Sequence, residues 1–254
     1  GVVNDVGFSA DGTIVFAAAG EPGLFGEVRL FKVADGSLIR VIQGHRDAIY
    51  AAELSPDGKL LATGSYDQKV KLWDVATGTE VRTLHGHNDA VYDVAFHPNG
   101  QMLASASGDR TVKLWNVATG ERLDTLNQPE KEQYAVAFSL DGKRVVAAGS
   151  DKRIRVWDIT AGGKEGTNPI AFARYAHEGG ILKLAFSPDG KTLVSSAEDR
   201  RIKLWETNSY TQLKVLETQP DWPQALAISP DNGQLLVGRL DGSLASYTIA
   251  GAGE

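Results

Sequence analysis

Histidine, serine and aspartate recur at a spacing that could serve acyl-transfer chemistry. His87, Ser105 and Asp109 have the residue types of a hydrolase triad, in which a base activates a hydroxyl nucleophile. The same types recur twice more, with threonine once in place of serine, at His45, Thr63, Asp67, His177, Ser195 and Asp199. An active site is normally unique, whereas a determinant of the fold repeats with it. The repetition favours a structural role, and we expect no catalytic residue.

Other chemical motifs are weak or absent. His85 and His87 lie two residues apart on an extended segment and could share a face, but no third metal ligand is visible. The chain has no cysteine, which excludes disulfides, thiolate metal sites and cysteine nucleophiles. It has no Walker-type phosphate loop and no dinucleotide fingerprint. We therefore predict neither a metal nor a cofactor.

Composition limits the partners. The chain has 254 residues, a net charge of −6 and no basic stripe, so nucleic acid is a poor candidate. With 42 % hydrophobic residues a packed core is expected. No apolar run approaches the roughly 18 residues of a membrane span, so we expect a soluble protein without membrane insertion. The compartment stays open between the cytoplasm and, for a secreted bacterial protein, the periplasm.

An internal repeat must position these residues. Six aromatic residues follow one another at spacings of 42, 42, 42, 48 and 42 residues. They are Phe31, Trp73, Trp115, Trp157, Trp205 and Tyr247. The turn Ser55-Pro56-Asp57-Gly58 returns unchanged at residues 187–190. A fixed period of this length indicates a repeat architecture.

Each repeat reads as four short strands. In the second repeat they are expected at residues 48–54, 59–64, 70–74 and 80–84, rich in Val, Leu, Ile and aromatics and separated by Gly, Pro and Asp. No helical periodicity is visible. One such unit cannot bury both of its faces, whereas units stacked around an axis bury each face against a neighbour. This predicts an all-β propeller.

The phrase Val70-Lys71-Leu72-Trp73-Asp74 and its copies resemble the WD40 repeat family over the whole chain. The resemblance implies one domain of six blades with four antiparallel strands each. We place the blades at about residues 1–43, 44–85, 86–127, 128–175, 176–218 and 219–254. The uniform repeats and the insertion at residues 20–26 are similar to bacterial WD40 domains, some of which accompany c-type haem modules. No haem motif occurs here.

The resemblance further implies that His, Ser or Thr, Asp and Trp form a buried hydrogen-bond chain in each well-formed blade. A hydroxyl can accept from a buried indole N–H while donating to an imidazole. The expected sets are His45, Thr63, Asp67 and Trp73 in blade two, His87, Ser105, Asp109 and Trp115 in blade three, and His177, Ser195, Asp199 and Trp205 in blade five.

The four residue types of the network are not present in every blade, and some blades offer more than one candidate hydroxyl. Ser65 and Ser107, two residues further along, compete for the hydroxyl role. Blade four keeps Asp151 and Trp157 but has Ala147 at the hydroxyl position and no matching histidine. We expect blades two, three and five to be the stiffest.

Propellers of this family commonly bind partners on the face where each innermost strand begins. Aligning the repeats places one residue per blade there: Asn4, Tyr50, Tyr92, Tyr134, Leu182 and Gln224. Tyr66, Trp222 and Phe25 are expected nearby. Tyrosine and tryptophan are enriched at binding hot spots, although these tyrosines could instead line the central channel. A polar rim is expected from Arg46, Asp47, Asp89 and Arg110.

The last repeat looks incomplete. Its third strand is expected at residues 242–249, followed only by residues 250–254, so an outer strand is missing. The chain is either a six-bladed ring with one short blade or six of seven blades, and we favour the second. An open sheet edge predicts self-association.

We therefore predict a non-catalytic scaffold for protein–protein interactions. One alternative is an accessory domain of a larger multidomain bacterial enzyme, such as a cytochrome-linked one. Another is a propeller that binds a small ligand, for which the glycine-rich segment at residues 20–26 is a candidate.

Overall fold

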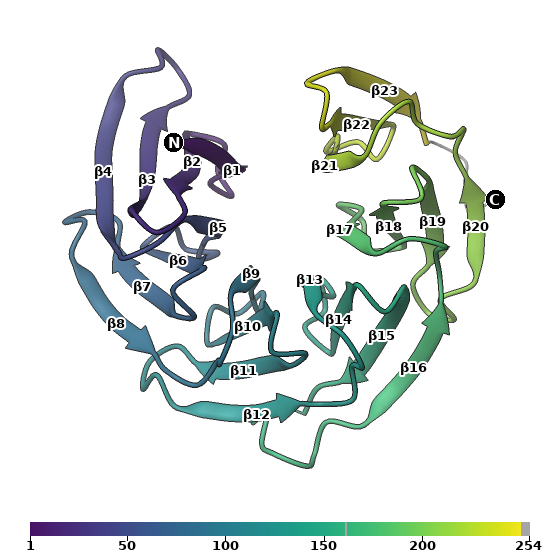
Figure 1. Cartoon of the computed structure of the whole chain (residues 1–254), viewed down its shortest axis with the longest axis horizontal. Helices are drawn as coiled ribbons and strands as arrows, with labels where there is room; N and C mark the ends of the chain where they lie inside the picture. The colour runs from purple at the N-terminus through teal and green to yellow at the C-terminus, as the bar shows by residue number, and fades with distance from the viewer. Residues whose placement is uncertain (161, 250–254) are drawn as a thin grey trace. The chain divides into compact units, whose positions relative to one another are not determined.

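The computed structural model describes residues 1–160 and 162–249 and is built from antiparallel sheets (Figure 1). Five sheets have four strands and one has three, and in each the strands pair in chain order. We call these sheets blades 1 to 6. The prediction of six all-β blades is confirmed, and within the described residues the last blade has three strands. Residues 250–254, which we assigned to that blade, lie outside the described part.

The chain divides into two compact units of three blades each. Unit 1 contains residues 1–129 and 162–166. Its strands are β1 (Val2–Phe8), β2 (Ile14–Glu21), β3 (Phe25–Lys32), β4 (Leu38–His45), β5 (Ile49–Leu54), β6 (Leu60–Ser65), β7 (Val70–Asp74), β8 (Glu80–Leu84), β9 (Val91–Phe96), β10 (Met102–Ser107), β11 (Val112–Asn116) and β12 (Arg122–Leu126).

Unit 2 contains residues 130–161 and 167–254, apart from those the structure does not describe. Its strands are β13 (Gln133–Phe138), β14 (Arg144–Gly149), β15 (Arg153–Asp158), β16 (Ile170–Tyr175), β17 (Ile181–Phe186), β18 (Thr192–Ala197), β19 (Ile202–Glu206), β20 (Gln212–Val215), β21 (Pro223–Ile228), β22 (Gln234–Arg239) and β23 (Leu244–Thr248). No helix in the described part of the chain is long and apolar enough to cross a membrane.

The core of each unit lies between successive blades. Side chains alternate along a strand, so β7 sends Val70 and Leu72 towards blade 3 and Trp73 towards blade 1. All three side chains are buried. Burying an aliphatic side chain of this size contributes roughly 1.5–3 kcal/mol, so the blade-to-blade contacts supply the main stabilisation of each unit.

Blades 1 and 6 each have one face on which apolar residues are exposed. Phe8 on β1 is 63 % exposed, whereas Leu54, at the same repeat position in blade 2, is 7 % exposed. Leu244 on β23 is 70 % exposed, whereas its equivalent Ile202 in blade 5 is fully buried. Blades 1 and 6 thus keep apolar residues at positions that other blades bury.

Candidate protein-binding face and buried networks

Each of the six innermost strands carries a β-bulge near its beginning. The pairing register shifts once between that strand and the second strand of its blade. The residues left without a register partner are Asn4, Tyr50, Tyr92, Tyr134, Leu182 and Gln224. These are the six positions that the repeat alignment selected. A bulge re-aims the side chain of its extra residue and ends regular pairing.

In unit 1 three tyrosines form a continuous aromatic surface. The Tyr50 ring centroid lies 6.1 Å from that of Tyr66 and 5.4 Å from that of Tyr92. Tyr66 is 48 % exposed, while Tyr50 and Tyr92 are partly buried. Burial, with the nearby Tyr66 and Asp47, raises the pKa of Tyr50, so its hydroxyl stays protonated. We name Tyr50, Tyr66 and Tyr92 the tyrosine patch.

In unit 2 the predicted face residues are less aromatic. Three of them are partly buried, namely Tyr134 on β13, Leu182 on β17 and Gln224 on β21. Trp222, just before β21, is 38 % exposed, and its carbonyl accepts from the Leu240 N–H. Burial raises the pKa of Tyr134 as well.

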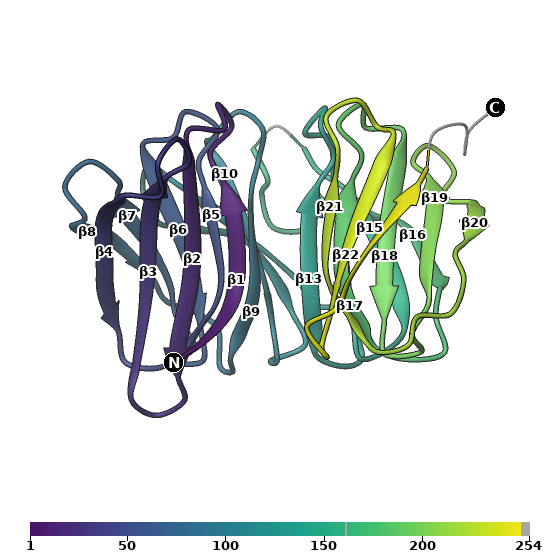
Figure 2. The ribbon, with the colours of Figure 1, turned by 90° about the horizontal axis from the view of Figure 1, so that it is seen from above.

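The glycine-rich segment at residues 20–26 is an extended hairpin that joins β2 and β3. Figure 2 shows it reaching beyond the neighbouring hairpins of unit 1. The Gly23 N–H donates to the Asp47 carboxylate at 2.8 Å. A Cβ at Gly26 would lie 2.3 Å from the Asp47 carbonyl oxygen, so only glycine fits there. Asp47, predicted as a rim residue, therefore anchors this hairpin, and Phe25 is partly buried beside it.

The structure brings together three of the expected networks. The indole N–H of Trp73 donates to Thr63 at 2.8 Å, and the Thr63 hydroxyl lies 2.7 Å from His45 Nε2. His45 Nδ1 lies 2.9 Å from Asp67. The same contacts recur, between 2.7 and 3.2 Å, in His87, Ser105, Asp109 and Trp115 and in His177, Ser195, Asp199 and Trp205.

The competing serines have another partner. Ser65 donates to the Ala48 carbonyl at 2.9 Å, and Ser107 donates to the Asp89 carbonyl at 3.1 Å. Both therefore tie their strand to the loop before the innermost strand. Thr63 and Ser105 are the hydroxyls in the networks, and both are fully inaccessible to solvent. A hydroxyl in this position cannot reach a substrate.

Charge states follow from burial. Desolvation lowers the pKa of His87 and His177, against the opposing effect of Asp109 and Asp199. Burial opposes ionisation of Asp199, yet its hydrogen bond and charge interaction with His177 lower its pKa to about 2. Each neutral imidazole then donates from Nδ1 to a carboxylate and accepts from the hydroxyl at Nε2.

These shifts predict acid sensitivity. A histidine whose pKa is lowered on folding stabilises the protein fully above about pH 6.5, the unfolded value, and less as the pH falls. We expect the free energy of unfolding, from urea titrations at pH 7.5 and 5, to fall more in the parent chain than in His87→Gln. The other titrating groups are the same in both proteins, so their contributions cancel when the two losses of unfolding free energy are subtracted. Equal losses would contradict a neutral His87.

Blade 4 replaces the network with an ion pair. Arg155 occupies the β15 position that holds Lys71 and Lys203 in blades 2 and 5. Its Nη1 donates to the Asp151 carboxylate, and both side chains are 4 % exposed. The guanidinium thus takes the place of the missing histidine. The repeat pattern did not predict this pair, because it defines the network by histidine and hydroxyl positions and Arg155 stands at neither.

Blade 6 has a hydrogen-bond network of different residue types at the same repeat positions. The Tyr247 hydroxyl donates to the Gln219 side-chain oxygen at 2.9 Å, and Arg239 Nη2 donates to the same oxygen at 2.8 Å. Gln219 stands at the histidine position of the repeat and Tyr247 at the tryptophan position. The repeat position is therefore kept although the residue types have changed.

A second unpredicted feature lies at the inner edges of unit 1. The Asp5 carboxylate of blade 1 accepts from the Ala52 N–H of blade 2 at 3.0 Å. Glu53 of blade 2 accepts from the Phe96 N–H of blade 3. Burial, together with nearby Asp93 and Asp5, raises the pKa of Glu53 to about 8. These carboxyl groups satisfy N–H groups on strands that have no further strand beside them.

No group of three His, Cys, Asp or Glu residues in the described part of the chain is arranged to hold a metal ion. His87, weighed with His85 as a metal ligand, has both ring nitrogens engaged in the blade 3 network.

Comparison with known proteins identifies a family. Residues 2–248 match the family model described as the IFT122 first beta-propeller. A 68-residue segment, 27 % of this chain, is 35 % identical to the intraflagellar transport protein 122 homologs of Homo sapiens and Xenopus tropicalis. The Mus musculus homolog is 32 % identical over the same length. The match covers 5 % of each relative. These relatives are eukaryotic and give no support to a bacterial origin of the repeat type.

Proposed function

Because this chain belongs to the family of the IFT122 first beta-propeller, we propose that it is a non-catalytic scaffold that binds other proteins. The relatives are named for intraflagellar transport, so we propose a partner from a multi-protein transport assembly. The buried hydroxyls of the three networks support a structural role for those residues.

The tyrosine patch carries this proposal. Tyr50 and Tyr92 occupy bulges, and Tyr66 extends the patch outward with half of its surface exposed. Tyrosine offers a large rigid ring with a polar tip, at a low cost in side-chain entropy on binding. Asn4 fixes the neighbouring strand, because its amide donates to the Ile49 carbonyl at 2.9 Å. This contact holds the start of β5, which carries Tyr50, from the side of blade 1.

The test compares partner binding by the parent chain and by a Tyr50→Ala, Tyr66→Ala, Tyr92→Ala variant of confirmed folding. A partner captured by the parent chain from lysate of the source organism would be identified, purified and titrated against both proteins. We expect binding to be at least about tenfold weaker in the variant, since hot-spot aromatics each contribute about 2 kcal/mol or more. Tyr175→Ala, an exposed tyrosine on the outer strand β16, is the control. Equal affinities for parent and triple variant would refute this face.

A second proposal concerns the uncovered faces of blades 1 and 6. Their apolar residues stand at repeat positions that inner blades bury, which supports coverage by another blade or another copy of the chain. The isolated chain should therefore self-associate as its concentration rises, measured by sedimentation velocity. Phe8→Lys and Leu244→Lys should reduce association, and Leu24→Lys at the hairpin tip should not. A monomer at all concentrations would contradict the proposal.

A further inference from the structure

The tyrosine patch ends at an aspartate in blade 3. The turn after β6 places the Tyr66 ring 6.1 Å from that of Tyr50. The same turn position after β10 holds Gly108, and both turn residues donate their N–H to a carbonyl just before the innermost strand of their blade. A Cβ at Gly108 would lie 3.0 Å from Asp89 Cγ. The Asp89 carboxylate therefore takes the place in blade 3 that the Tyr66 ring takes in blade 2, next to Tyr92.

The negative charge of Asp89 is not neutralised within the described part of the chain. Asp89 is exposed, and its Oδ1 accepts from the N–H of the next residue at 2.7 Å. It forms no ion pair with any residue that the structure describes. The exposed Arg46 and Arg110 lie on the same face and pair with neither Asp89 nor Asp47. The patch is thus bordered by carboxylates that can still pair with a cation.

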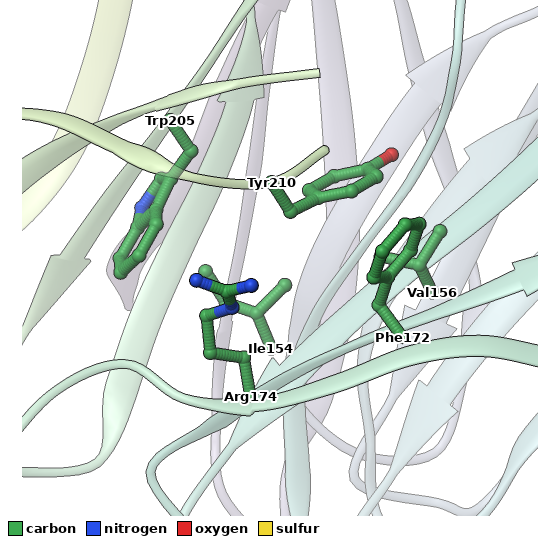
Figure 3. A pocket seen from close by; sticks show the side chains of 6 residues that line it. All are labelled: Ile154, Val156, Phe172, Arg174, Trp205 and Tyr210. Carbon is green, nitrogen blue, oxygen red and sulfur yellow. The ribbon is translucent and has the colours of Figure 1, made fainter. Parts of the chain in front are cut away.

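Unit 2 shows how this chain holds an arginine against a pair of aromatic rings. Phe172 and Tyr210, both labelled in Figure 3, have ring centroids 5.3 Å apart and ring planes inclined by 50°. The Arg144 guanidinium carbon lies 5.6 and 5.7 Å from the two centroids. Its Nε donates to the Asp158 carboxylate at 3.1 Å. Two tilted rings and one carboxylate thus bind one guanidinium, which is attracted both by aromatic faces and by negative charge.

The tyrosine patch contains the rings and the carboxylate of this arrangement. The Tyr50 and Tyr92 ring centroids lie 5.4 Å apart and the ring planes are inclined by 49°, nearly the values of the pair in unit 2. Asp89 supplies the carboxylate beside them. Among the cations that the structure describes, none lies over the Tyr50 ring. A guanidinium from outside the chain would complete the set.

We propose that the tyrosine patch binds an arginine side chain of the partner protein, with the guanidinium over the Tyr50 and Tyr92 rings and paired with Asp89. Arginine is favoured over lysine, because its planar group stacks on a ring and pairs with a carboxylate at the same time. The net charge of −6 also attracts a basic partner. The inference rests on the proposed function of this face and adds the chemistry that the face recognises.

The test titrates the parent chain with N-acetyl-arginine N-methylamide and with its citrulline counterpart, which has nearly the same shape and no charge. The readout is the nuclear magnetic resonance of the tyrosine rings in selectively labelled protein. The chain has seven tyrosines, so the ring signals are few, and single Tyr→Phe variants assign them. We expect arginine to shift the signals of Tyr50, Tyr66 and Tyr92 to saturation. Citrulline should bind at least about fivefold more weakly, because it lacks the charge.

Two aspartate variants locate the charge. Asp89→Asn removes the charge and keeps the Oδ1 that accepts from the N–H of the next residue. Asp221→Asn is the matched control, because Asp221 stands at the same repeat position in blade 6 and accepts from the Trp222 N–H at 2.8 Å, but has no tyrosine patch beside it. We expect arginine to bind about fivefold more weakly to Asp89→Asn and equally to Asp221→Asn and the parent chain.

The inference is overturned if arginine shifts none of these signals, if citrulline binds as tightly, or if Asp89→Asn and Asp221→Asn have equal affinities for arginine. The same variants separate it from the proposed function. A partner that is lost by the triple tyrosine variant but binds Asp89→Asn as it binds the parent chain would keep the face and refute the arginine. A partner that binds the triple variant unchanged, together with Asp89-dependent binding of arginine, would keep the arginine site and refute the proposed function.

Discussion

Replacing Trp115 by alanine is expected to lower the free energy of unfolding by about 3–5 kcal/mol. The indole is 1 % exposed, packs in the core between blades 2 and 3, and donates to the Ser105 hydroxyl at 2.8 Å. Its removal creates a cavity and breaks the chain that runs through His87 to Asp109. Both losses fall on the same blade contact, which explains the large effect.

Urea unfolding followed by circular dichroism measures this loss. Trp222→Ala is the matched control, because Trp222 is 38 % exposed and lies outside the buried networks. The control should change stability far less than the Trp115 variant. An unfolding curve for Trp115→Ala that superimposes on the parent curve would remove the basis for the network's structural role.

The second large effect is expected in blade 4. Asp151→Asn leaves the buried Arg155 guanidinium without its carboxylate, and an uncompensated buried charge costs about 3–5 kcal/mol. The same substitution in blade 5, Asp199→Asn, faces a neutral imidazole and should cost only about 1–2 kcal/mol. Equivalent repeat positions thus give unequal losses, because the partners differ in charge.

A compensating variant tests the cause. Adding Arg155→Met to Asp151→Asn removes the unpaired charge and should restore most of the lost stability, since well-packed apolar residues often replace buried ion pairs without loss. The measurement is urea unfolding of the single and double variants. A double variant less stable than Asp151→Asn would show that Arg155 contributes by packing and not by its charge.

Much of the fold follows from residue spacing. The period of the tryptophans and the Ser-Pro-Asp-Gly turns set the number and phase of the blades, because each turn ends one strand and each tryptophan marks the third. Aligning the repeats in this way selected one residue in each innermost strand, and the structure shows that each of them lies at a β-bulge. The bulges themselves were not predicted.

In the features that were not predicted, a residue at one repeat position takes over a contact that another position makes in the other blades. Arg155 reaches a histidine's partner from the lysine position. Tyr210 stands at the repeat position that holds Gly78 and Gly120 in blades 2 and 3. A pattern that assigns one residue type to each repeat position does not reveal such exchanges. Asp5 and Glu53 were missed because their partners are backbone N–H groups of the next blade, which leave no residue signature.

Those two carboxyl groups also give the assembly of unit 1 a direction. Asp5 caps the blade made after its own, and Glu53 does the same one blade later. During synthesis the capping group therefore leaves the ribosome before the strand edge that needs it. A newly emerged innermost strand finds its acceptor already in place and is not left open to pairing with another nascent chain. Blades 1 and 2 thus carry in advance the groups that cap the inner edges of blades 2 and 3.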